Sequence, residues 1–156
     1  MHGVKRQVSG EYVITNEERV RRSFSMQGFM STLRAELTAV AQGSVEIRLP
    51  FSPRLTQQNG YLHAGAISAV LDSACGYAAL TMAADDMEVL TVELKMNLLA
   101  PAAGEDFAAR AQVKRAGRTL TVCAADAFAI RNGEETVVAT MLATIMAVPI
   151  NPAKNL

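Results

Sequence analysis

The sequence predicts a single α+β domain in which a curved, mainly antiparallel sheet wraps around one long central helix. Residues 61–84 form an apolar run rich in small side chains, which is typical of a helix packed closely against another layer. Before and after this run, apolar and polar residues alternate over short segments, as in half-buried strands. Short turns separate most of these segments, and such turns favour antiparallel neighbours.

Length and charge restrict the class of protein. The 156 residues are enough to bury one core, and we divide them into a tail (1–15), one domain (16–150) and a second tail (151–156). Fifteen basic and fifteen acidic residues cancel, so the composition gives no electrostatic reason to expect nucleic acid or a membrane surface as a partner. We see no signal peptide at the N-terminus. Cys75 and Cys123 fit buried, reduced thiols, and we expect a cytoplasmic protein.

The segments follow one another in a definite order. Residues 16–31 predict a short amphipathic helix that begins with a capping box formed by Thr15 and Glu18. Residues 33–51 predict a hairpin around Gln42-Gly43. After the central helix, four strand-like segments (89–99, 107–113, 119–130 and 135–148) predict a meander, with Asn132-Gly133 as a strong turn signal.

The strand pattern and the small residues of the central helix predict how the two layers face each other. In the segment 89–99, the alternation puts Val92, Leu94 and Met96 on one face and Thr91 on the other. The small residues of the central helix allow the sheet to approach it closely, and the sheet edges remain available to pair with a second copy of the chain.

Asp72 is the one charged residue in the central helix. A charge near the centre argues against membrane insertion, and the run is mostly alanine without basic flanks, so we reject a transmembrane helix. Asp72 could lie on a solvent-facing side of the helix, but no other charged residue accompanies it. A carboxylate in an otherwise buried helix is costly unless it is paired, hydrated or used, which makes Asp72 a candidate functional residue.

His63-Ala64-Gly65 stands where the central helix is expected to begin. The first backbone N–H groups of a helix have no partner within the helix, and they attract anions and polarised carbonyl oxygens. The sequence therefore predicts two chemical features, a group of backbone donors and a carboxylate. No set of His, Cys and acidic residues has the spacing of metal ligands, so we expect no metal and no cofactor.

The run Gly60-Tyr61-Leu62-His63-Ala64-Gly65, with Asp72 nine residues after the histidine, resembles the hotdog-fold acyl-CoA thioesterases of the PaaI-like group. Two later segments, TVELKMNLLAPAAGE and KRAGRTLTV, are similar to a strand and a hairpin of that group. The resemblance covers roughly residues 33–148. It implies a hotdog fold and hydrolysis of an acyl thioester, usually of coenzyme A, by a homodimer that assembles into a tetramer.

The resemblance also implies roles for residues around the helix. The Ala64 N–H, supported by Gly65, would form an oxyanion hole, and Asp72 of the partner chain would act as general base or nucleophile. The family usually has glycine after the histidine, but Ala64 keeps the donor if its φ is negative. His63 would orient the turn before the helix.

Further family positions fall in loops and strands. Gln57, followed by Asn59, stands where relatives often have an asparagine that orients the carbonyl or the water. Thr91 falls near the attacking water, with an ordinary strand threonine as the alternative. Arg115, Gly117 and Arg118 form the hairpin where relatives contact pantetheine and phosphates, although a charged hairpin tip is often simply solvated.

Two other functions are alternatives to thioester hydrolysis. A non-catalytic acyl-CoA-binding or sensing module of the same fold would gain nothing from a carboxylate beside the acyl group, so Asp72 favours the enzyme. A hotdog dehydratase would need a histidine paired with the aspartate, and none follows Asp72.

Overall fold

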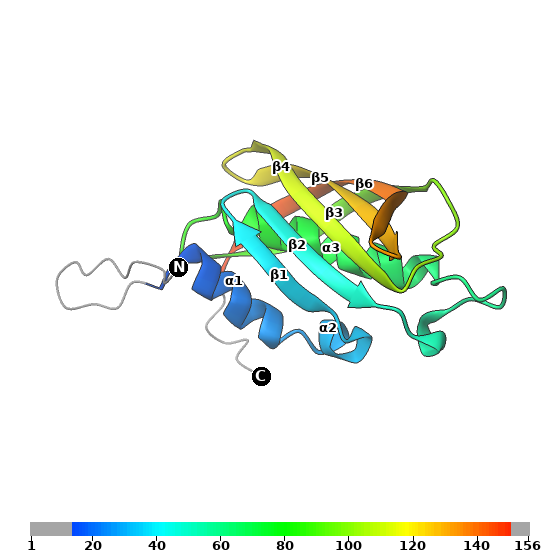
Figure 1. Cartoon of the computed structure of the whole chain (residues 1–156). Helices are drawn as coiled ribbons and strands as arrows, with labels where there is room; N and C mark the ends of the chain where they lie inside the picture. Colours follow the sequence, from blue (N-terminus) through cyan, green and yellow to red (C-terminus); the bar gives the residue numbers. More distant parts are fainter. Residues whose placement is uncertain (1–13, 151–156) are drawn as a thin grey trace.

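The computed structural model describes residues 14–150, so the predicted tails lie almost wholly outside the described residues. One helix, α3, packs against the inner side of a curved sheet, and two shorter helices precede the sheet in the chain (Figure 1). The helices are α1 (Asn16–Ser25), α2 (Gly28–Leu33) and α3 (Ala64–Leu80), with a 3₁₀ turn at Pro53–Leu55. The strands are β1 (Glu36–Ala41), β2 (Ser44–Pro50), β3 (Met87–Leu98), β4 (Asp106–Ala116), β5 (Leu120–Arg131) and β6 (Glu134–Pro149).

The sheet is antiparallel throughout, in the order β1-β2-β4-β5-β6-β3. The predicted four-strand meander is therefore wrong, because only β4, β5 and β6 follow one another and β3 pairs with β6 at the far edge. Residues 99–105 carry the chain between these places: the Leu99 N–H donates to the Val138 carbonyl, and the Glu105 N–H donates to that of Ile130. Alternation shows that a segment is half-buried, but it does not say which strand lies beside it.

Local signals account for most of the helix and turn boundaries. The capping box is present, with the Glu18 N–H donating to Thr15 Oγ1 and the Glu18 carboxylate accepting from the Thr15 N–H. The predicted helix over 16–31 is wrong as one element, since α1 ends at Ser25 and α2 begins at Gly28. Positive φ angles at Gly43, Asn132 and Gly133 form the two predicted hairpin turns.

Small side chains let α3 lie directly against the sheet. Ala74, Cys75 and Ala78 are fully buried, and Cys123 of β5 donates from its thiol to the Cys75 carbonyl oxygen at 3.4 Å. Burial raises the pKa of both thiols, that of Cys123 to about 11. The two cysteines thus occupy the core as reduced, unreactive side chains.

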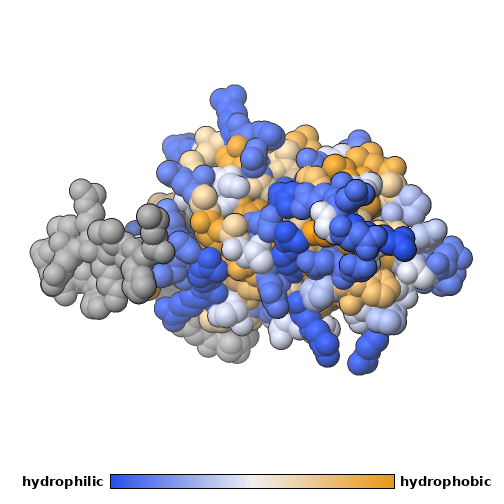
Figure 2. Space-filling view, viewed as in Figure 1, coloured by the Kyte–Doolittle hydropathy of each residue, from blue (hydrophilic) through white to orange (hydrophobic). Residues whose placement is uncertain are grey.

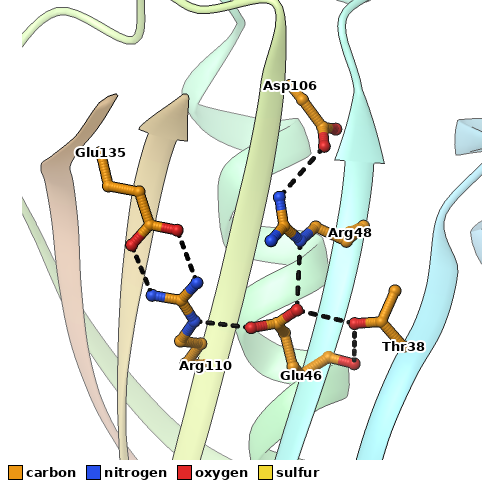
Figure 3. Close-up of polar contacts among 6 residues, drawn as sticks. All are labelled: Thr38, Glu46, Arg48, Asp106, Arg110 and Glu135. Atoms are coloured by element: carbon orange, nitrogen blue, oxygen red, sulfur yellow. Dashed lines mark hydrogen bonds and ion pairs between the residues drawn. The ribbon is translucent and has the colours of Figure 1, made fainter. Parts of the chain in front are cut away.

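The face of the sheet turned away from α3 carries an ion-pair network (Figure 3). Glu46 accepts hydrogen bonds from Arg110 Nε at 2.6 Å, Arg48 Nε at 3.1 Å and Thr38 Oγ1 at 2.8 Å. Arg110 also binds Glu135 with both terminal nitrogens. Burial by itself would raise the pKa of Glu46, but these hydrogen bonds outweigh it and lower the pKa to about 2. The network joins four strands on the side opposite the cavity described below.

Within residues 14–150, no helix is long and apolar enough to cross a bilayer. Hydrophobic and hydrophilic side chains are interspersed over the face in Figure 2.

Candidate active site

Asp72 is hydrogen-bonded to a strand residue in the folded chain. It lies on the half-buried side of α3, and the Thr91 hydroxyl of β3 donates to its Oδ1 at 2.7 Å. A hydrogen bond to a charged acceptor is stronger than one between neutral groups, so it holds the carboxylate in one orientation. Two predicted site residues are therefore in direct contact.

A β-bulge brings Thr91 to this position. Thr91 lies opposite Ile145 of β6, whereas Glu93 lies opposite the preceding residue, so Val92 is extra. Ile145 is buried on the side of the sheet that faces α3, and Thr91, which lies opposite Ile145, faces α3 as well. Beyond the bulge, the residue of β3 that points to this same side is Leu94. The prediction that Thr91 lies on the face opposite Leu94 and Met96 is thus wrong, because one extra residue reverses the alternation.

Asp72 and Thr91 open into a cavity of about 940 Å³ between α1, α3 and β3. On α3 the lining residues recur every three to four positions and form one side of the helix: Asp72, Ser73, Gly76, Tyr77 and Leu80. Met87 and Val89 of β3 form the facing wall. The cavity thus has a mixed lining, in which apolar side chains of α3 and β3 lie beside the charged residues Arg19, Arg22, Asp85 and Glu88.

The break between α1 and α2 closes one side of this cavity. Met26 and Gln27 line it, and the Ser73 hydroxyl donates to Gln27 Oε1 at 3.3 Å. The ring of Phe24 meets that of Tyr77 edge-on, with 5.7 Å between the ring centroids. Sequence reasoning missed these cavity residues. The helical spacing from Asp72 to Gly76 and Leu80 could have identified the α3 wall, but nothing in the sequence indicates the contact with Gln27.

The N-terminus of α3 provides a backbone donor that has no partner among residues 14–150. His63 is the N-cap, and its Nδ1 accepts the Gly65 N–H at 2.8 Å. The N–H groups of Ala66 and Ile67 bond to the His63 carbonyl. Within the described part of the chain, no hydrogen bond uses the Ala64 N–H. Ala64 has a negative φ, as the alanine at this position requires.

The loop before α3 folds Gln57 back onto its own turn. The Asn59 N–H donates to Gln57 Oε1, the Gly60 N–H donates to the Gln57 carbonyl at 3.0 Å, and Gly60 has φ +83°. The His63 N–H donates to the Leu55 carbonyl at 2.8 Å and fixes where the helix begins. Gln57 and Asn59 therefore belong to the loop that leads to the helix N-terminus.

The structure keeps the predicted residues in three separate groups within one chain. Ala64 and Asp72 are eight residues apart on α3, which at 1.5 Å per residue separates them by about 12 Å. Arg115, Gly117 and Arg118 lie exposed in the β4–β5 hairpin and do not line the cavity. At Gly117 a Cβ would approach the Leu120 carbonyl oxygen to 2.7 Å, so this turn requires glycine. Among residues 14–150, no cluster of His, Cys, Asp and Glu is arranged to hold a metal ion.

Comparison with known proteins gives consistent results. Residues 59–136, half of the chain, match the family described as the thioesterase superfamily. A thioesterase family protein from Silicibacter pomeroyi has a crystal structure with 52% sequence identity and a TM-score of 0.85, covering 86% of this chain and 99% of that one. A candidate esterase from Saccharolobus solfataricus is 33% identical over 90 residues, which are 58% of this chain. The match spans 64% of that esterase, a little under two thirds of its length.

More distant structures share the fold. The E. coli PaaI protein from the phenylacetic acid degradation operon has a TM-score of 0.76 at 16% identity, with 85% of this chain and 93% of PaaI covered. At this identity the likeness is one of architecture, in which an antiparallel sheet wraps around a central helix as it does here. The family-model match over half of the chain shows that the chain belongs to the thioesterase superfamily, a family of thioester hydrolases, and its architecture is the hotdog fold.

Proposed function

We propose that the protein is an acyl-CoA thioesterase whose active site is built from two chains. The Ala64 N–H of one protomer would polarise the thioester carbonyl, and Asp72 of the partner would activate the attacking water. The observation that carries this proposal is the free Ala64 N–H at one end of α3 and the Asp72–Thr91 pair about 12 Å away along the same helix. One carbonyl group cannot reach both within a single chain.

The edge of the sheet supports assembly into a homodimer. Within the described residues, β3 pairs only with β6, so the other edge of its 12 residues is unpaired. Four large apolar side chains on β3, Leu90, Val92, Leu94 and Leu98, are 40–57% exposed. Such an edge is a template for pairing with a second copy. The opposite edge is less available, because Arg21 of α1 donates to the Leu37 carbonyl of β1.

The proposed reaction needs no group beyond these residues and water. Asp72 takes a proton as the water oxygen bonds to the carbonyl carbon, and the backbone donor stabilises the negative oxygen that forms. When this intermediate collapses, the C–S bond breaks and the proton moves to the leaving thiolate, giving a free acid and coenzyme A. Thr91 orients the carboxylate throughout. In the alternative mechanism, Asp72 attacks the carbonyl carbon itself, the coenzyme A thiolate leaves, and water then hydrolyses the resulting anhydride.

Thiol release from a panel of acyl-CoA thioesters tests the proposal. We expect Asp72→Asn to lower kcat by about 10³-fold or more, because the amide cannot accept the proton. Asp126→Asn, at an exposed position of β5, is the matched control and should retain wild-type kcat. If a folded Asp72→Asn protein hydrolyses the panel at the wild-type rate, Asp72 has no part in the mechanism.

A further inference from the structure

A glycine lies in the middle of α3 where neither the backbone nor the packing requires one. Gly76 has no positive φ, and apart from the helix's own backbone a Cβ built on it meets no heavy atom within 4 Å. Glycine in a helix interior is less stable than alanine, since it loses more chain entropy on folding. Stability alone therefore favours alanine at this position.

Contact with the sheet does not explain the glycine either. Fully buried positions of α3 such as Ala74 and Ala78 carry alanine rather than glycine. Gly76 is only half-buried and lines the cavity. It follows Asp72 by four residues, which puts it one helical turn further along the same side of α3.

The cavity extends beyond Gly76, where apolar side chains of α3 and β3 line it together with the charged side chains of Arg19, Asp85 and Glu88. It runs past Tyr77 to Leu80 on α3, with Met87 and Val89 on the facing wall. The eight residues from Asp72 to Leu80 span about 12 Å, the length of a medium-chain acyl group. A side chain at position 76 would project into this part of the cavity next to the carboxylate.

We propose that Gly76 is a specificity-determining residue, and that the cavity holds the aliphatic tail of a medium-chain acyl thioester. The inference rests on the proposed function in one respect, namely that the thioester carbonyl lies at Asp72. The tail then passes over the Gly76 Cα, and its end reaches Leu80. Longer tails bury more apolar surface, and each buried methylene is worth up to about fourfold in kcat/KM.

The experiment compares chain-length profiles of wild type and Gly76→Leu with acetyl-, butyryl-, hexanoyl- and octanoyl-CoA. We expect the wild-type kcat/KM to rise toward octanoyl-CoA. In Gly76→Leu, the ratio of octanoyl to acetyl kcat/KM should fall at least tenfold, the worth of about two methylenes. Gly28→Leu is the matched control, because Gly28 also has open space around it in a helix but does not line the cavity. An unchanged ratio in Gly76→Leu overturns the inference.

Two further measurements keep this result separate from that of the hydrolase proposal. Octyl-CoA, a thioether, cannot be hydrolysed, and its Kd should rise at least tenfold in Gly76→Leu relative to wild type. If wild type binds octyl-CoA, Gly76→Leu binds it more weakly, and neither hydrolyses a thioester, the acyl-tail site is supported and the hydrolase proposal is refuted. If both proteins bind octyl-CoA equally, or neither binds it, the acyl-tail site is refuted. Gly76→Ala should raise the thermal midpoint; a large decrease would show that glycine serves packing and would overturn the inference.

Discussion

Removing the Ala64 N–H tests the oxyanion donor with little disturbance of the helix. Ala64 is the first residue of α3, and proline is well tolerated there because that N–H has no partner within the helix. Proline also requires an extended residue before it, and His63 already has φ −67° and ψ 138°. Ala64→Pro should therefore fold normally and lack only the donor.

The structure sets the expected magnitude. The Gly65 N–H is bound to His63 Nδ1 at 2.8 Å, so Ala64 supplies the free donor of this pair. Loss of one oxyanion donor costs about 10²–10³-fold in kcat, or roughly 3–4 kcal/mol of transition-state stabilisation. We expect a loss in this range with KM changed much less, since the interaction strengthens as negative charge develops on the carbonyl oxygen.

Thiol release with octanoyl-CoA measures this loss, and Ala64→Ser, which keeps the N–H, is the control. Mixing Ala64→Pro with Asp72→Asn chains should restore part of the activity, because half of the sites in a mixed dimer then combine two intact groups. If Ala64→Pro is folded and retains kcat within about twofold of wild type, the helix N-terminus is not the oxyanion hole. If mixing restores nothing although mixed dimers form, each site lies within one chain.

Three further changes have defined outcomes. Thr91→Val removes a hydrogen bond to a carboxylate, worth about 1.5–3 kcal/mol, and should lower kcat roughly tenfold or more; Thr144→Val on the opposite face of the sheet should not. The pKa of Glu46, lowered to about 2, means that its ionised form stabilises the fold above about pH 4.5 and that this stability is lost as pH falls toward 2. Glu46→Gln should thus cost about 2 kcal/mol in urea unfolding near pH 7 and much less near pH 3; an equal loss at both pH values contradicts the assignment. Replacing Arg115 and Arg118 by alanine should raise KM for acyl-CoA more than it lowers kcat, and a KM unchanged at low salt would show that the hairpin does not bind phosphate.

Local chemistry in the sequence was sufficient for the elements that depend on neighbouring residues. The capping box of Thr15 and Glu18 starts α1, and Gly43 and Asn132-Gly133 form the turns they predict. The small residues of 61–84 predict a helix against a sheet, and α3 is that helix. The helix start at His63-Ala64 and the isolated charge of Asp72 were also visible, because a cap and a lone charge are read from a few adjacent residues.

The tertiary structure decided what depends on partners distant in sequence. β3 pairs with β6 rather than β4, and alternation alone cannot choose between such edges. The bulge at Val92 turns Thr91 toward Asp72, and a single extra residue of this kind leaves no sequence signal. The cavity over Gly76 likewise exists only because α1, α3 and β3 meet there. Helices and turns are set by contacts over three or four residues, whereas register and cavities are set by the packing of whole elements.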